Sequence, residues 1–291
     1  MLHAIVCGGV PLTAKDERLL EALLKGPEQP GVLARASLLV GQHAQPGLDV
    51  ERYMAGLEED IVTLRLRMPK DASRTWVIAL LNRFLFEERG YRGNQDNYYD
   101  PRNSLLHSVM DRRLGIPITL SILYLELGWG LGLPLQGVAF PGHFLVKCPM
   151  ERGMVILDPF HGGVSLSEAG LRDRLQQQGL DLQARPDVQD WLQLADRRAI
   201  LSRLLRNLKR IYVDSANLAD AIQVLNLLLV VEPGAARELR DRGNLFRRME
   251  CWGAAVSDLE AALASGGLET EDAEEARQAL VELRARPRLL H

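Results

Sequence analysis

The chain of 291 residues is 47% hydrophobic and 25% charged, an ordinary composition for a globular protein whose length suggests about two domains. Its formal net charge of −3 argues against recruitment of nucleic acid or an anionic membrane through bulk charge. The three cysteines lie far apart and are odd in number, so they predict neither a disulfide framework nor a zinc cluster.

The start of the chain is apolar only briefly and has no charged region before the apolar run, which argues against a secretory signal. No stretch approaches the roughly 20 apolar residues of a membrane-spanning helix. Sparse, unpaired cysteines suit a reducing compartment. We therefore expect a cytoplasmic protein that uses no cofactor and has neither nucleic acid nor membrane as its partner.

Residues 12–90 predict helices, which we interpret as scaffold. Leucines recur at helical spacing between residues 19 and 24, and apolar residues do so again between residues 57 and 64. The segment 76–88 has the pattern of another helix with one apolar face, and Gly90 follows it as an end signal.

From residue 91 to residue 104 the sequence changes to a polar loop that contains three tyrosines. Gly, Asn, Asp, Pro and Ser favour turns because their side chains bond to the local backbone. The loop either binds a polar ligand or a peptide, or only braces the core. Asn103 also suits the start of the next helix. The candidate ligand-binding residues are Asn94, Asp96, Tyr98, Tyr99, Asp100, Arg102 and Asn103.

The middle of the chain predicts helices followed by strands. A short helix ends at Gly115, and a second one spans residues 116–131, with Pro117 suited to its first turn. Short apolar runs at residues 137–140, 143–148 and 154–158, separated by Gly and Pro, then predict adjacent antiparallel strands.

From about residue 197 the sequence is helical again and repeats itself. Three pairs of similar residues are each separated by 34 positions, which is the tetratricopeptide period of paired helices. A helix at residues 271–284 would cap two such units. The alternative is a plain helical bundle with chance similarity. The pairs are Tyr212 with Phe246, Ala221 with Ala255, and Leu225 with Leu259.

The most specific chemical feature is a histidine and an aspartate at neighbouring strand ends. His143 opens one predicted strand and Asp158 closes the next, so an antiparallel pairing brings the two together. A carboxylate beside an imidazole fixes its tautomer and stabilises its charged form, as in nucleophile–His–Asp triads. The nucleophile of such a triad belongs at the start of a helix, where the helix dipole stabilises a thiolate.

The stretch from Asn97 to Lys147, including NYYDPRNS, LGIPITLS and FPGHFLVK, together with ILDPFHGG, resembles the bacterial SirB family. The resemblance covers roughly residues 30–285. It implies an α+β protein with a helical N-terminal region, a transglutaminase-like, papain-like core with a small antiparallel sheet, and C-terminal tetratricopeptide-like repeats. We place the domains at residues 1–190 and 191–291. His143 and Asp158 match two of the catalytic positions of transglutaminase-like proteins.

The third catalytic position departs from the active pattern, because the cysteine position falls at or near Pro117. Cys148 lies an odd number of residues after His143 on the same predicted strand and should point to the other face. Thr119 and Ser121 are weaker hydroxyl candidates, since small polar residues on a packed helix commonly bond back to a carbonyl.

His161 is the last candidate, either lining the same cleft or lying in a surface turn. No His or Cys pair shows metal-ligand spacing, so no metal site is predicted.

Three functional hypotheses follow. The first is a non-catalytic protein that binds a peptide or protein partner through a degenerate cleft and through its repeats. The second is a cysteine-independent hydrolase or acyltransferase that uses His143 and Asp158 with Ser121, Thr119 or a bound water. The third is a structural adaptor in which the His–Asp pair only holds two strands together. Neither substrate nor partner identity is encoded in these motifs.

Overall fold

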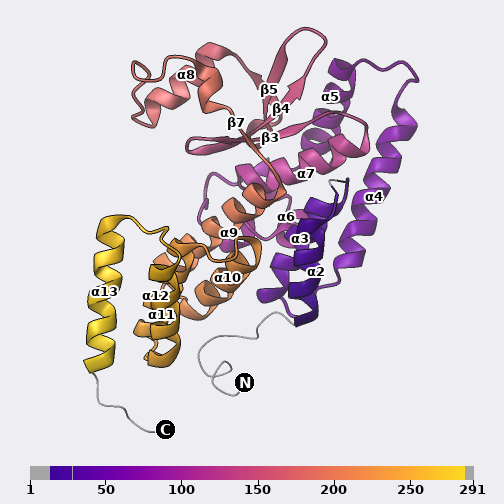
Figure 1. The fold of residues 1–291 in the computed structure, drawn as a ribbon. Helices are drawn as coiled ribbons and strands as arrows, with labels where there is room; N and C mark the ends of the chain where they lie inside the picture. The colour runs from indigo at the N-terminus through magenta and orange to yellow at the C-terminus, as the bar shows by residue number, and fades with distance from the viewer. Residues whose placement is uncertain (1–13, 28, 286–291) are drawn as a thin grey trace. The chain divides into compact units, whose positions relative to one another are not determined.

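A computed structural model of the chain describes residues 14–27 and 29–285, which form two compact units (Figure 1). We call residues 23–41 and 47–204 the core unit, and residues 1–22, 42–46 and 205–291 the repeat unit. The boundary between residues 204 and 205 falls within helix α9 (Arg197–Asp214).

The core unit contains an antiparallel sheet of five strands in the order β6-β5-β4-β3-β7. A tight turn joins β3 to β4, because Phe140 pairs with His143 and Gly142 takes a positive φ of 66°. The strands are β3 (Gln136–Phe140), β4 (His143–Pro149), β5 (Met154–Asp158), β6 (Val164–Leu166) and β7 (Gln193–Ala195).

Helices cover both faces of this sheet, with α7 (Pro117–Gly130) on one side and α8 (Glu168–Gln177) on the other (Figure 1). The α8 face is a buried cluster in which Leu171 and Leu175 pack against alternate strand residues such as Leu145. Almost every residue of α7 is buried. A helix that is apolar all round belongs in the middle of a domain, and α7 is therefore the centre of the core unit.

Shorter helices surround α7 and complete the core unit. Glu126 near the end of α7 is buried and accepts a hydrogen bond of 2.7 Å from the backbone N–H of Ala34, so its carboxylate holds the first turn of α3. Burial raises the pKa of this carboxyl. These elements are α3 (Val32–Val40), α4 (Val50–Arg67), α5 (Arg74–Asn82), the π-helical turn η2 (Arg83–Glu88) and α6 (Leu106–Arg112).

The sequence-based prediction of an α+β core followed by helical repeats is confirmed. The helix predicted at residues 76–88 runs through α5 and then widens into the π-helical turn before Gly90. Three elements, β6, β7 and α8, do not follow from the sequence pattern. Both strands span only three residues, and most of their side chains are not buried, so they carry no clear alternation of apolar and polar residues.

The repeat unit consists of paired helices with a regular period. The helices α10 and α12 begin at Leu218 and Trp252, and α11 and α13 begin at Ala236 and Thr270; each pair of starts is 34 residues apart. The aligned positions at 221, 255, 225 and 259 are fully buried. The helices are the repeat-unit part of α9, α10 (Leu218–Val231), α11 (Ala236–Arg248), α12 (Trp252–Ala264) and α13 (Thr270–Ala285).

An ion pair recurs at the same period. Arg206 Nε contacts Glu238 Oε1 at 2.8 Å, and Arg240 contacts Asp272, which is the same pair moved by 34 residues. Equivalent positions in successive units therefore make equivalent contacts, as nearest-neighbour stacking of repeats requires.

Two further features of the chain complete the description. Cys251 is in a disulfide bond, contrary to the expectation from cysteine spacing, while Cys148 is free and buried. Among the residues that the structure describes, no helix combines the length and the apolar character needed to cross a membrane.

We predict opposite effects of two glycine-to-alanine substitutions on stability. A Cβ at Gly130, where α7 crosses α4, would stand 2.6 Å from Ile61 Cδ1, whereas a Cβ at Gly56 in α4 meets no atom within 4 Å. Gly130→Ala should therefore cost about 1–3 kcal/mol through overpacking. Gly56→Ala should gain about 0.5–1 kcal/mol through helix propensity. Urea unfolding measures both, and equal effects would contradict this packing.

Candidate functional site

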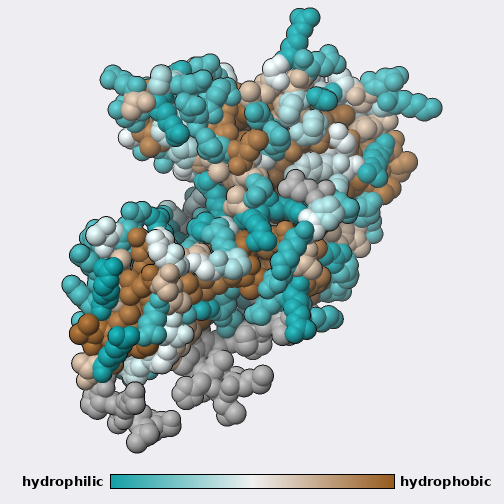
Figure 2. All heavy atoms as spheres, viewed as in Figure 1, coloured by the Kyte–Doolittle hydropathy of each residue, from teal (hydrophilic) through white to brown (hydrophobic). Residues whose placement is uncertain are grey.

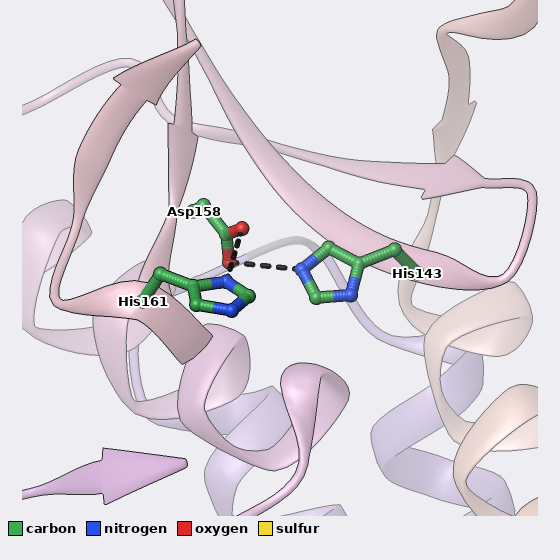
Figure 3. A group of neighbouring side chains, drawn as sticks. All are labelled: His143, Asp158 and His161. Carbon is green, nitrogen blue, oxygen red and sulfur yellow. Dashed lines mark hydrogen bonds and ion pairs between the residues drawn. The ribbon is translucent and has the colours of Figure 1, made fainter. Parts of the chain in front are cut away.

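The site is built around the carboxylate of Asp158, which is fully buried and accepts from four donors, two of which are the histidines drawn in Figure 3. His143 Nε2 lies 2.9 Å from Oδ1, and His161 Nδ1 lies 2.8 Å from Oδ2. Arg174 of α8 contacts Oδ2 at 2.8 Å, and the backbone N–H of Phe160 donates to Oδ1 at 3.1 Å. A buried charge needs such pairing, because removal from water otherwise costs several kcal/mol.

Local backbone structure places each histidine. His143 follows the tight turn at Gly142 and opens β4, and Asp158 ends the neighbouring β5. The chain then forms the 3-10 turn η4 (Pro159–His161), with the Asp158 side chain capping its first N–H. This turn brings His161 back onto the same carboxylate. The adjacency of His143 and Asp158 that the sequence predicted is present.

The electrostatics of the site favour an ionised Asp158. Burial alone would raise its pKa, but the hydrogen bonds and charges of His143 and His161 outweigh burial and hold the pKa well below its usual value. An ionised carboxylate only accepts hydrogen bonds. Each histidine therefore presents an N–H to Asp158, on Nε2 of His143 and on Nδ1 of His161.

Aromatic rings surround the two imidazoles. The Phe160 ring makes edge contacts with His143 and His161, at centroid distances of 5.9 and 5.1 Å. Tyr98 contacts Phe160 at 6.3 Å, and the more exposed Tyr99 contacts Tyr98 at 5.3 Å. Tyr98 and Tyr99, two of the predicted ligand-binding residues, therefore lie next to the site.

Most other polar residues of the 91–104 loop bond to each other. Asn94 is buried and donates to Asn103 Oδ1 at 3.0 Å, and Asn103 donates to the carbonyl oxygens of residues 97 and 98. Asp100 is buried and pairs with Arg102 at 2.7 Å. These four residues brace the loop, which was the alternative interpretation of their sequence. Asp96 is exposed and stays a ligand-binding prediction.

None of the candidates for a nucleophile is hydrogen-bonded to His143 among the described residues. Pro117 is the first residue of α7. The Thr119 hydroxyl donates to the carbonyl of Asn103 at 2.8 Å and accepts from the backbone N–H of Ile116. Ser121 is fully buried, and its hydroxyl has no hydrogen-bond partner among the described residues. Neither hydroxyl is hydrogen-bonded to His143 within residues 14–27 and 29–285, so this geometry does not support hydroxyl catalysis.

Two arginines of the site were missed by the sequence analysis. Arg174 pairs with Asp158, and Arg203 on α9 donates to the carbonyl oxygens of Phe140 and His143, at 3.1 and 2.8 Å. Arg203 therefore holds both ends of the turn that carries His143. Both arginines lie in helical segments that contain several arginines, so their spacing does not distinguish them from arginines outside the site.

The structure also assembles a group that could hold a metal ion, contrary to the expectation from spacing. His143, Asp158 and His161 each offer one ligand atom, and these three atoms lie within 4.8 Å of one another. His143 lies 15 positions before Asp158, and His161 lies 3 positions after it. The pairing of β4 with β5 brings His143 to the other two residues.

A cavity of about 490 Å³ lies elsewhere in the core unit, beside β7 and the end of α7. His143 is not among its lining residues, which include Trp129, Leu133, Leu135, Leu194 and Ile200.

Comparison with known sequences decides the family. The profile of the Transglutaminase-like superfamily matches residues 51–206, more than half of the chain and most of the core unit. The chain belongs to the transglutaminase-like superfamily. A tetratricopeptide repeat profile matches residues 208–281 of this transglutaminase-like protein, in the repeat unit.

Several bacterial relatives of this transglutaminase-like protein carry the name UPF0162. A UPF0162 protein of Xylella fastidiosa is 37% identical over 78% of this chain and 81% of its own length. One from Pseudomonas aeruginosa is 30% identical over 81% of this chain and 85% of its own length. A shorter similarity, 42% over 24% of this chain and 11% of the relative, links it to human F-box only protein 21.

We predict that Asp158→Asn lowers the free energy of unfolding by about 3 kcal/mol at pH 7, because it removes the only charge that pairs with Arg174 in this site. The folded protein binds the Asp158 proton less tightly than the unfolded chain does, whose carboxyl has a pKa of about 3.9. The stabilisation is therefore complete above that pH and is lost as the pH falls towards the lower folded value.

Urea unfolding from pH 7 down to pH 3 measures this difference. Asp173→Asn, which changes an exposed carboxylate on the same helix as Arg174, is the matched control and should cost little at any pH. A gap between wild type and Asp158→Asn that stays constant on acidification would contradict the role given to Asp158.

Proposed function

We propose that this protein is a non-catalytic member of the transglutaminase-like superfamily, of the SirB type and cytoplasmic, that binds a peptide or protein partner. The contact surfaces are the one beside His143, with Tyr98 and Tyr99, and the C-terminal repeats. The observation that carries the proposal is the start of α7, where Pro117 stands at the position expected of the nucleophile. A proline side chain has no group that attacks a carbonyl.

The state of His143 supports this interpretation. Its Nε2 faces Asp158, and its Nδ1 forms no hydrogen bond with any residue that the structure describes. A general base must lie within hydrogen-bond reach of the proton it removes, although distances in free enzymes can be loose. The His–Asp half of a triad is present here, and a partner for Nδ1 is not supplied by Thr119 or Ser121.

The repeat unit supports the binding part of the proposal. A groove of about 380 Å³ runs along α9 and α11, with an apolar floor and charged walls. Arg248 on its wall forms no ion pair with the described residues. Figure 2 shows hydrophobic surface between hydrophilic residues in the area of α11–α13. Grooves of this kind suit peptides with apolar anchors and acidic neighbours. The groove is lined by Lys209, Arg210, Val213, Asp214, Leu225, Asp241, Asn244, Leu245 and Arg248.

A second candidate function is a cysteine-independent hydrolase or acyltransferase. The preserved geometry of His143 and Asp158, with the tautomer of the imidazole fixed, is the observation in its favour. Because no hydroxyl within residues 14–27 and 29–285 is hydrogen-bonded to His143, the nucleophile would be a bound water. Acylation or hydrolysis of peptides by the wild-type chain, abolished by His143→Ala, would establish this function in place of the first.

A designed cysteine tests the assignment of Pro117. We predict that Pro117→Cys creates a thiol that iodoacetamide modifies at least tenfold faster than an unperturbed thiol, because a helix start and an imidazole both stabilise a thiolate. The double variant Pro117→Cys with His143→Ala should lose most of this gain. Mass spectrometry of the peptide that contains residue 117 measures the rate without interference from other cysteines. Equal rates in both variants would mean that Pro117 is not opposite His143.

Binding is tested with peptides selected on the full chain from a random display library. We predict that Tyr99→Ala weakens the selected peptides about tenfold, which corresponds to 1.4 kcal/mol and suits loss of an exposed aromatic anchor. Leu66→Ala is the matched control, since Leu66 is 84% exposed on α4 and belongs to neither proposed surface. Fluorescence anisotropy gives the affinities. Selected peptides that lose affinity with Leu66→Ala but not with Tyr99→Ala would place the binding surface elsewhere.

A further inference from the structure

The strand β7 has an open edge. β7 ends the five-stranded sheet, so one of its edges pairs with β3 and the other faces away from the sheet. Its three residues are exposed or half-buried. An open edge presents backbone N–H and C=O groups to which another extended chain can hydrogen-bond.

The register of the sheet determines which groups of β7 face outwards. Phe140 and His143 pair across a turn of only two residues, so they are hydrogen-bonded to each other. Bonded and non-bonded pairs alternate along antiparallel strands, so every second residue of β3, counted back from Phe140, bonds to β4. Val138 belongs to this set. Its partner Leu194 therefore directs its own N–H and C=O away from β3, and neither group is hydrogen-bonded within the part of the chain that the structure describes.

The cavity of about 490 Å³ lies against this strand. Leu194 and Ala195 form part of its wall, and the Leu194 side chain is 56% exposed. Trp129 forms another part of the wall and is held by a hydrogen bond of 2.8 Å from its Nε1 to the carbonyl oxygen of Leu135. Ligand pockets usually measure about 300–1,000 Å³. A segment that paired with β7 would therefore have an apolar cavity of suitable size beside it.

The charges next to β7 favour a basic ligand. Asp190 precedes the strand and Asp196 follows it, and both are exposed. Neither carboxylate forms an ion pair within residues 14–27 and 29–285; that of Asp196 accepts a hydrogen bond from the first turn of α9. The neighbouring cations, Arg197 and Arg198, both have partners within the chain, and Arg197 donates to two backbone carbonyl oxygens of the core unit.

We propose that the open edge of β7 binds an extended basic segment of a partner protein as an additional strand, with a large apolar side chain of that segment in the cavity. The backbone of Leu194 supplies hydrogen bonds, and the cavity supplies selectivity for a side chain, which is the division of roles in strand addition. A second copy of the chain is a poorer occupant. Two three-residue edges overlap over only about 10 Å, too little for the ~1,000 Å² of a specific interface.

This site is separate from both surfaces of the proposed function, because His143 does not line the cavity and the groove belongs to the repeat unit. Each can therefore fail without the other.

Proline substitutions at the two edges of the sheet test the proposal. Leu194→Pro removes an outward N–H and keeps the bonds to β3, since an edge strand tolerates proline there. Ser165→Pro is the matched control. Ser165 is the exposed middle residue of β6 at the opposite edge, and it also faces outwards, because its partner Leu157 bonds to β4 by the same alternation.

The probes are peptides of about ten residues, selected from a random display library on the full chain and counter-selected on Leu194→Pro. We expect surviving peptides that combine Lys or Arg with a large apolar residue. They should bind Leu194→Pro at least tenfold more weakly than wild type, as the loss of strand hydrogen bonds implies, and Ser165→Pro within twofold of wild type. If Leu194→Pro does not fold, Leu194→Lys at the same exposed position takes its place, since its charge repels a basic peptide.

N-methylation of single peptide amides shows whether a surviving peptide binds as a strand. Binding should weaken at alternate amides only, because every second residue of a strand bonds to a given neighbour. Replacing the apolar residue of the peptide by alanine should also weaken it at least tenfold. The absence of surviving peptides, N-methyl effects without alternation, or equal weakening by Ser165→Pro would overturn the proposal. So would a wild-type dimer that Leu194→Pro abolishes, since a second copy would then be the occupant.

Discussion

The buried carboxylate of Asp158 is the constraint on which the rest of the site depends. A fully buried charge must be paired from several sides, and here the partners come from β4, η4 and α8. Each contact fixes the position of a different element against the end of β5. The orientation of His143, the return of the chain at His161 and the docking of α8 through Arg174 are therefore consequences of satisfying one side chain.

Arg174 changes what the His–Asp pair can do. In a triad with a thiolate, the carboxylate stabilises an imidazolium, and the charges of the three groups are coupled. In this protein the carboxylate is already paired with a guanidinium, and α7, the helix expected to carry the nucleophile, begins at Pro117. The carboxylate then serves to orient His143, whose Nδ1 forms no hydrogen bond with the described residues and is open to a ligand.

The sequence correctly predicted the elements that depend on residues close together along the chain. The strand ends at His143 and Asp158 follow from the glycines and prolines around them, the buried α7 follows from its apolar length, and the repeat follows from its 34-residue period. The sequence did not predict the side chains that distant elements bring to Asp158. Arg174 contacts Asp158 only because α8 packs on the face of the sheet opposite to α7, and no spacing in the sequence encodes that path.

The same distinction explains the loop from residue 91 to residue 104. Its composition predicted turns correctly, but composition does not tell which polar groups will satisfy each other. Asn94 and Asn103 do so across nine residues, and Asp100 does so with Arg102, so their donors and acceptors are used within the loop. The two tyrosines next to Phe160 keep part of their surface exposed, and composition alone does not single them out.

The repeats show the same principle of polar groups used internally. Arg206 with Glu238 and Arg240 with Asp272 are one interaction repeated at the period of the fold, and Lys209 with Asp241 adds a further contact between α9 and α11. Arginines that stabilise neighbouring units in this way have little charge left for a partner. Arg248 lies on the groove wall outside this series. For the proposed groove, this leaves its apolar lining and Arg248, which forms no ion pair with the described residues, as the features that would select a partner, and net charge would contribute little to that selection.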